Sequence, residues 1–302
     1  MFETPILYLI FNRPNLTEIT FPSICNIKPK KLFIAADGPR NGNQDDELNC
    51  MIARQYVLSK IDWDCEVQTL FRDENLGCGI AVSSAISWFF SHVEKGIILE
   101  DDCLPDLSFF NYCENLLDYY HHDDEVMSIS GTNLLGNTYK KNQESYFWSF
   151  GGIWGWATWR RAWINFDFNM PKLSQVRIQE KLRKSLFTDG WYNHYYTMFI
   201  ETSIGKIDTW DAQWFFSILI NNGISINPRV NLVKNIGFGA SATHTKNDKD
   251  NFGSSTTKQI IFPLIHPDHK KIDLKYLKKV YKLIYPKLTF KYKVARLFSR
   301  YL

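Results

Sequence analysis

The first third of the chain repeats one pattern, in which a short apolar run is followed by a polar turn and a stretch with helical periodicity. The apolar runs predict strands at 5–11, 32–36, 65–73 and 96–102. The stretches between them predict helices at 17–27, 45–60 and 74–93. Short strands that alternate with helices favour an α/β fold, with a mostly parallel sheet flanked by helices.

The pattern is less regular after residue 105. It predicts helices at 106–120, 174–200 and 208–223, and strands at 125–131 and from residue 224. Residues 145–163 form a Gly- and Trp-rich segment that leads into a helix, and 240–258 are polar enough to suggest a mobile flap.

Each predicted strand of the first third ends in a polar turn. These turns hold Asn12-Arg13, Asp37-Gly38, Arg72 with Asn75, and Glu100-Asp101-Asp102. Because ligands of parallel α/β sheets bind beyond the carboxyl ends of the strands, we expect the four turns to contribute to one site.

The triplet Glu100-Asp101-Asp102 directly follows the apolar run 97–99. Adjacent carboxylates at the end of a buried strand repel one another and lose hydration. A hard divalent cation is the simplest partner, since Mg²⁺ is usually held by one or two carboxylates together with substrate phosphates. The alternative is a solvated turn after a strand.

Two arginines at the same predicted edge suggest the rest of the ligand. Arg13 and Arg72 could offer forked donors to phosphate oxygens, so that a metal and a diphosphate would bind together. The patterns GxxxxGK[ST] and GxGxxG are both missing, which leaves a P-loop kinase or a classical dinucleotide enzyme unsupported.

At this point the chain resembles a known family. The stretches "NRP", "DGPR", "FRDENLGCGIA" and "ILEDDCLP" are similar to the GT-A fold, a Rossmann-like fold of nucleotide-sugar glycosyltransferases. The likeness covers about residues 5–245. It extends to the Golgi N-acetylglucosaminyltransferase that starts complex N-glycans, and to bacterial surface-polysaccharide enzymes that carry "WGWATWxRAW", as at 154–163 here.

The resemblance implies a hexosyltransferase-type enzyme that depends on Mn²⁺ or Mg²⁺. It would move a sugar, with inversion, from a nucleotide diphosphate donor (a UDP-sugar by expectation) to a glycan or lipid-linked glycan acceptor in polysaccharide biosynthesis. The acidic triplet would be the family's DXD-type motif.

The resemblance also implies roles in the donor site. Asp37 would contact the base and Arg13 the diphosphate, while Arg72 and Asn75 would support the nucleotide pocket. Asp102 would be the direct metal ligand, with Glu100 and Asp101 nearer the donor sugar or ribose. From the residues alone, Asp37 could equally serve its Asp-Gly-Pro turn, and Arg72 could pair with Asp73 or Glu74.

Further roles fall in the second half of the chain. Asp211 would be the general base that an inverting transferase needs, with Asp208 and Glu201 as rivals and a helix N-cap as the structural alternative. Trp154 and Trp156 would stack on donor or acceptor sugar, or else pack in the core. His244, in a loop that resembles a donor-closing loop, would complete the metal shell.

Composition sets the broad class. The 302 residues are 45% hydrophobic and 16% aromatic, which suits one large α/β unit. We expect a catalytic domain at 1–265, with a nucleotide-binding half at 1–105 and an acceptor-binding half at 106–265. The six cysteines show no metal-binding spacing and no secretory signal is recognised, so we expect a cytoplasmic protein with reduced thiols.

The basic residues are concentrated in the C-terminal tail, 266–302. This tail carries nine net positive charges, which leaves −6 for the rest of a +3 chain. Apolar residues at helical spacing predict two basic amphipathic helices, separated at Pro286. They could dock on anionic lipid at the inner membrane face, or pack on the catalytic domain. The acidic body argues against nucleic acid as a partner.

Two other functions remain open from the sequence. A sugar-nucleotide pyrophosphorylase would use a related sheet, but it would want a Gly-rich, basic loop after the first strand, where Asn12-Arg13-Pro14 stands. A non-catalytic carbohydrate-binding protein could keep the fold without turnover.

Overall fold

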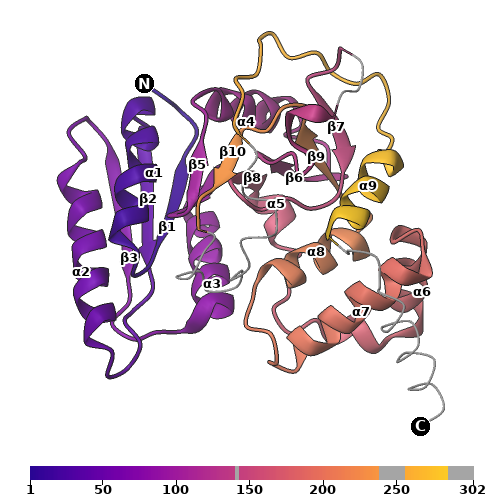
Figure 1. The fold of residues 1–302 in the computed structure, drawn as a ribbon, viewed down its shortest axis with the longest axis horizontal. Coiled ribbons are helices and arrows are strands. Elements are labelled where there is room, and N and C mark those ends of the chain that lie inside the picture. The colour runs from indigo at the N-terminus through magenta and orange to yellow at the C-terminus, as the bar shows by residue number, and fades with distance from the viewer. Residues whose placement is uncertain (140–142, 238–255, 285–302) are drawn as a thin grey trace.

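The chain was studied as a computed structural model, which describes residues 1–139, 143–237 and 256–284 (Figure 1). His244, most of the predicted flap and the second predicted tail helix lie outside the described residues.

An eight-stranded sheet runs through the molecule in the order β3-β2-β1-β4-β8-β6-β9-β7. Its strands are β1 (Ile6–Ile10), β2 (Lys31–Ala36), β3 (Glu66–Phe71), β4 (Lys95–Glu100), β6 (Val126–Ser130), β7 (Tyr146–Ser149), β8 (Trp156–Trp159) and β9 (Ile224–Pro228). Six strands run in one direction, and only β8 and β7 run against them. The predicted mostly parallel α/β sheet is confirmed.

A second, smaller sheet pairs β5 (Cys103–Pro105) with β10 (Val233–Asn235) in antiparallel register. The helices are α1 (Pro14–Ile27), α2 (Gln44–Ser59), α3 (Gly77–His92), α4 (Ser108–Tyr119), α5 (Arg160–Trp163), α6 (Val176–Ser185), α7 (Asp189–Ser203), α8 (Asp211–Ile220) and α9 (Leu274–Ile284), with short 3-10 turns at Gly136–Thr138 and Pro171–Ser174.

Helices cover both faces of the sheet, and an apolar layer fills each interface. One layer joins the sheet to α1, α2 and α4, through side chains such as Phe21, Val57 and Phe109. The other joins it to α3, α5 and α8, through Phe89, Trp163 and Trp214. The strands β1, β2 and β4 are buried on both faces, which explains their nearly unbroken apolar sequence.

Two predictions about the second half were incomplete. The Gly- and Trp-rich segment contains two short strands, β7 and β8, before its helix, and the helix expected at 174–200 is two helices, α6 and α7. The four residues of each strand are all buried, so no alternation of polar and apolar positions marks them. Between α6 and α7, Phe187 adopts a left-handed backbone conformation (φ 56°), which breaks the helix.

The first tail helix, α9, packs on the body of the protein. Its residues Tyr276, Leu277 and Val280 are buried in a third apolar cluster with α6, α7 and α8. The buried carboxylate of Asp273 accepts from the backbone N–H groups of Lys275 and Tyr276, both at 3.1 Å, and from the Tyr139 hydroxyl at 2.6 Å. Packing on the rest of the chain, one of the two alternatives, therefore describes α9.

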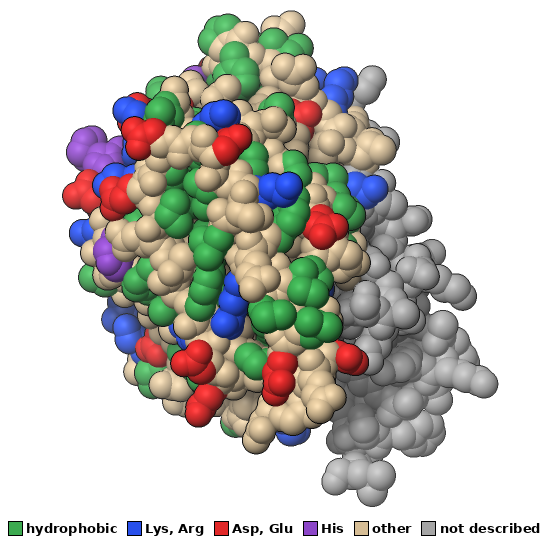
Figure 2. Space-filling model, turned by 90° about the vertical axis from the view of Figure 1, so that its left-hand side faces the viewer, with side chains coloured by type: hydrophobic (Ala, Val, Ile, Leu, Met, Phe, Trp, Pro, Cys, Tyr) green, Lys and Arg blue, Asp and Glu red, His purple; other side chains and the backbone are tan. Residues whose placement is uncertain are grey.

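Acidic and basic side chains are interspersed on the face at the α2 and β3 end of the molecule, with apolar side chains between them (Figure 2). All six cysteines are free thiols. Within the part of the chain that the structure describes, no helix is long and apolar enough to cross a bilayer.

Candidate active site

The acidic triplet lies where β4 ends, beside the end of β1. The Asp101 backbone N–H donates to Leu9 at 2.9 Å, and its carboxylate accepts from the Phe11 backbone N–H at 3.2 Å. Asp101 is only 1% exposed. It is therefore held as part of the fold, and its carboxylate ties the β1 end to the β4 end.

Arg13 is the counter-ion of the triplet. Its guanidinium bonds to Asp101 and donates to Asp102 Oδ2 at 3.1 Å. The residue stands just before Pro14, the first residue of α1. The predicted contact of Arg13 with a diphosphate stays a prediction, since two arms of the fork are already bound to carboxylates.

One guanidinium does not neutralise three carboxylates. Burial, followed by the charge of Asp102, raises the pKa of Glu100 to about 8. Burial also raises the pKa of Asp101 to about 6, although Arg13 acts in the opposite direction. Burial and the neighbouring carboxylates thus both oppose ionisation of Glu100 and Asp101, and the end of β4 holds more potential negative charge than Arg13 balances.

This charge suits a divalent cation. The Asp102 side chain is 14% exposed and Glu100 is also partly exposed, whereas Asp101 is buried, so an ion could reach Asp102 and Glu100. Among the described residues, no group of three or more His, Cys, Asp and Glu side chains could hold an ion unaided. Mg²⁺ commonly binds through one or two carboxylates plus substrate phosphates, and such a site needs no larger group.

The small β5–β10 sheet brings a distant segment onto Asp102. The backbone N–H of Ile236 donates to the Asp102 carbonyl at 2.8 Å. Gly237 lies so close that a Cβ atom there would be 2.4 Å from Asp102 Oδ2. The chain continues from Gly237 toward His244, whose predicted metal contact lies outside the described residues.

Asp37 and Asn75 form a bridge between the ends of β2 and β3. The Asp37 carboxylate accepts from the Asn75 amide at 2.9 Å and from the backbone N–H groups of Gly38 and Leu76 at 3.0 Å. Burial raises the pKa of Asp37, although the hydrogen bonds from the Leu76 and Gly38 backbone act in the opposite direction. Local turn chemistry therefore describes Asp37 well, and a contact with a base stays a prediction.

Arg72 lies at the same bridge. It donates to Ser84 Oγ of α3 at 2.8 Å, and within the described residues no ion pair joins it to Asp73 or Glu74. Burial lowers the pKa of the Arg72 guanidinium, and the charge of Asp37 acts in the opposite direction. Arg72 and Asn75 thus sit together where a nucleotide pocket was predicted.

Asp211 is the first residue of α8. Its carboxylate accepts from Thr209 Oγ1. Burial, and then the charge of Asp211, raise the pKa of Tyr195 to about 12. The charge of Asp211 also adds to the raised pKa of Glu100, for which burial is the main cause. The fold therefore brings Asp211 and the triplet within electrostatic reach, although they are far apart in the sequence.

Asp208, a rival for the base, caps a helix. Its two carboxylate oxygens accept from the backbone N–H groups of Cys78 at 2.9 Å and Gly79 at 2.8 Å, in the first turn of α3. No side chain caps that helix locally, because Leu76 stands at its N-cap. The arrangement occupies Asp208 and leaves Asp211 as the better candidate for a base.

The predicted sugar contact of Trp156 needs correction. Trp156 is completely buried and stacks on Trp210 at 5.5 Å between ring centroids, so its ring packs in the core as the structural alternative held. A four-residue strand that enters the sheet beside β4 leaves this ring no open face. Trp154 is half-buried, just outside the strand, and its role stays a prediction.

A cavity of about 270 Å³ opens beside Asp211. Its walls come from α7, α8 and α9, from the loop before β8, and from Ser128 of β6. They include Ser128, Phe150, Gly152, Trp191, Tyr195, Met198, Asp211, Trp214, Phe215, Leu277, Val280 and Tyr281.

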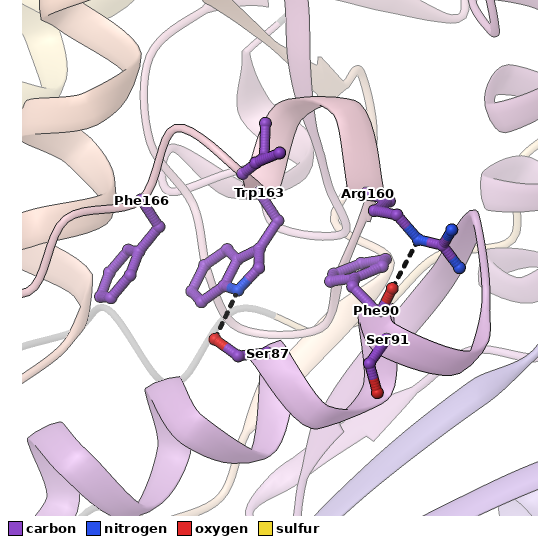
Figure 3. A pocket seen from close by; sticks show the side chains of 7 residues that line it. Ser87, Phe90, Ser91, Arg160, Trp163 and Phe166 are labelled. Atoms are coloured by element: carbon purple, nitrogen blue, oxygen red, sulfur yellow. Dashed lines mark hydrogen bonds between the residues drawn. The ribbon is translucent and has the colours of Figure 1, made fainter.

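A second hollow, of about 300 Å³, lies between α3 and α5 (Figure 3). There the Trp163 indole N–H donates to Ser87 Oγ at 3.0 Å, and Arg160 Nε donates to the Phe90 carbonyl at 2.5 Å. These contacts join α5 to the last turns of α3, where a cation suits the free carbonyls. Their role is structural.

The sequence analysis did not identify Asp46 as part of this region. The Asp46 carboxylate accepts from the Asn12 amide at 2.6 Å and from the Arg40 guanidinium at 2.8 Å, and so fixes the turn that precedes Arg13. It also did not identify Asp208 as the cap of α3. One signal pointed to such a partner, since α3 starts at Asn-Leu-Gly without a capping side chain of its own.

No protein-family model matches the chain, and its sequence matches no curated protein. Among solved structures, S. aureus TarS 1-349 shares 10% identity over 77% of this chain, at a TM-score of 0.41, and this chain spans 59% of it. The inositol-1-phosphate CTP transferase from T. maritima shares 11% identity over 84% of this chain and 96% of its own, at 0.40. A UDP-glucose pyrophosphorylase complexed with UDP-glucose shares 9% identity with this chain, over 74% of this chain and 89% of its own, at a TM-score of 0.34. At these values the function has to be argued from the chain's own residues.

Proposed function

We propose that the protein is a metal-dependent GT-A-type glycosyltransferase, which moves a sugar with inversion from a nucleotide diphosphate, UDP first among the candidates, to a carbohydrate or lipid-linked glycan acceptor. One observation carries the proposal: the triplet with its Arg13 counter-ion lies within electrostatic reach of Asp211. An acidic group that one guanidinium only partly balances, and a separate carboxylate, are the two parts that such a transfer requires. A role in surface polysaccharide synthesis belongs to this proposal.

The triplet would serve the leaving group. Asp102 would hold Mn²⁺ or Mg²⁺, and the ion would supply the positive charge that stabilises the departing diphosphate. Arg13 keeps Asp101 and Asp102 in place and lowers the cost of bringing the donor's negative charge to this edge. Glu100, whose pKa is raised by burial and then by the charge of Asp102, would gain most from the bound cation.

Asp211 would accept the proton of the acceptor hydroxyl as that oxygen attacks the anomeric carbon. It lines the cavity, accepts a hydrogen bond from the Thr209 hydroxyl, and is the first residue of α8. This position places the Asp211 carboxylate at the positive end of the α8 helix dipole.

The pyrophosphorylase alternative is less well supported. The connection from β1 to α1 is only Phe11, Asn12 and Arg13, and the Arg13 side chain is bound to carboxylates. Such a turn offers no row of backbone N–H groups to cradle a triphosphate.

Thermal-shift screening tests the proposal directly. The full chain is heated with UDP-, GDP-, dTDP- and CMP-linked sugars, each with and without Mn²⁺. We expect one nucleotide class to raise the melting temperature only when Mn²⁺ is present, because binding to the folded state stabilises it. If no nucleotide sugar shifts the midpoint with either Mn²⁺ or Mg²⁺, the proposal fails.

A further inference from the structure

The cavity beside Asp211 has the chemistry of a selective acceptor site. We infer that it receives the acceptor's terminal sugar ring and prefers a ring that carries a methyl group, as a 6-deoxyhexose or an N-acetylhexosamine does, over a fully hydroxylated hexose. This inference rests on the proposed function and names the acceptor class for the same site.

The walls are mainly apolar. Trp191, Tyr195 and Phe215 form a continuous aromatic wall, with ring centroids 6.2 Å apart for the first pair and 4.8 Å for the second. Sugar rings offer C–H faces to such a wall. Met198 from α7 and Leu277 and Val280 from α9 add aliphatic surface.

Polar groups are few in the cavity. The polar side-chain groups of its lining residues are the hydroxyls of Ser128, Tyr195 and Tyr281, the Asp211 carboxylate and the indole N–H groups of Trp191 and Trp214. A hexose that buried all of its hydroxyls there would leave some of them unpaired, which is costly. A ring in which a methyl replaces one polar group would fill the aliphatic side at less cost.

The tail helix makes this wall part of the fold. The Asp273 cap fixes the start of α9, and Tyr276 Oη accepts from the Leu134 backbone N–H at 3.0 Å. Gly190 lets the Tyr281 hydroxyl approach α7, since a Cβ atom at this position would lie 2.8 Å from it. The basic helix predicted for lipid docking therefore uses its apolar side to shape the cavity.

Asp211 sets how a ring would lie. It is on the wall of the cavity and is the first residue of α8, so a hydroxyl of the bound ring could face this carboxylate. Ring binding and proton acceptance would then take place at the same end of α8.

Matched glycosides test the preference. The probes are methyl β-D-fucoside against methyl β-D-galactoside, which differ only in the C6 hydroxyl, and methyl N-acetyl-β-D-glucosaminide against methyl β-D-glucoside. Binding is followed by tryptophan fluorescence, because Trp191 and Trp214 line the cavity, with UDP and Mn²⁺ present throughout. In at least one pair we expect the methyl-bearing probe to bind about tenfold or more tightly.

Two variants of α9 locate the binding. Val280→Phe should fill the cavity and reduce probe affinity at least tenfold, whereas Leu283→Phe, on the exposed side of the same helix, should leave it unchanged. Where Val280→Phe does not fold, Met198→Phe replaces it. Equal affinity within both pairs, no binding of any probe, or unchanged binding in the filled variant would overturn the inference. Retained Mn²⁺-dependent UDP binding in the same samples shows that the proposed function stands regardless.

Discussion

The two sides of the candidate site are built from opposite materials. On the β1–β4 side, charged side chains form ion pairs with one another, as Arg13 does with Asp101 and Asp102. On the α7–α8–α9 side, aromatic and aliphatic side chains enclose a cavity in which Asp211 is the only carboxylate among the described lining residues. The first side can position charge, and the second can select shape.

The difference shows where each kind of residue is replaceable. A carboxylate at the charged side destabilises its neighbours when no cation is bound, so its removal can leave the fold intact. A large aromatic residue beneath the second side fills volume that nothing else fills, so its removal costs stability. Function and stability should therefore separate by residue type.

The largest expected effect is on the charged side. Asp102→Asn should abolish transfer and Mn²⁺-dependent UDP binding, because it removes the proposed ligand charge. Its melting temperature without metal should match or exceed that of the wild type, since one repulsive carboxylate beside Glu100 is gone. Differential scanning fluorimetry with and without UDP and Mn²⁺ measures both. Asp64→Asn, at an exposed position, is the control, and normal UDP–Mn²⁺ binding by Asp102→Asn would disprove the metal assignment.

The next effect is on stability alone. Trp156→Ala should lower the free energy of unfolding by about 3–5 kcal/mol, because it deletes a fully buried ring. Trp154→Ala, at a half-buried neighbour, should cost less. Urea unfolding of both variants decides the matter, and a Trp156 variant as stable as the wild type would contradict the core assignment.

Asp211→Asn should lower turnover about 100-fold or more, the range of general-base catalysis, while donor affinity changes little. Single-turnover kinetics and UDP titration give the two values. Asp208→Asn serves as the comparison, since it weakens the cap of α3 and should cost about 1 kcal/mol of stability. Wild-type turnover in Asp211→Asn would move the base to Glu201 or Asp208.

The smallest effect concerns pH. Hydrogen bonds from Arg40, and then from Asn12, lower the pKa of Asp46 to about 2. A carboxyl with a lowered folded-state pKa stabilises the protein above its unfolded value of about 4 and loses this contribution as pH falls toward 2. Asp46→Asn should therefore cost about 1 kcal/mol at pH 6, since Arg40 is largely exposed to solvent. The difference from the wild type should shrink between pH 4 and pH 2.5 in urea titrations, and a constant difference would contradict the assignment.

The charged side was largely predictable from the sequence. Apolar runs and polar turns alternate along the first hundred residues, and parallel strands place those turns at one edge. What could not be predicted was how the groups pair, such as Arg13 with the triplet, because side-chain direction at a turn depends on contacts between distant strands.

The cavity side was not predictable to the same extent. Its walls join the loop at 150–153 to α7, α8 and α9, which the sequence spreads over some 130 positions. Trp156 is an example. From the sequence, an aromatic residue next to glycines could equally stack on a ligand or pack in the core. Only the antiparallel pairing of β8 with β4 decides between the two.

Product analysis of a UDP-sugar is the most direct test of the central claim. The full chain is incubated with Mn²⁺, inorganic pyrophosphate and the UDP-sugar that gives the largest thermal shift, and phosphorus NMR identifies the nucleotide released. We expect UDP, formed slowly with water as acceptor and lost in Asp102→Asn. Formation of UTP and a sugar 1-phosphate would instead establish a pyrophosphorylase, and would contradict the assignment of Asp211 as an acceptor base.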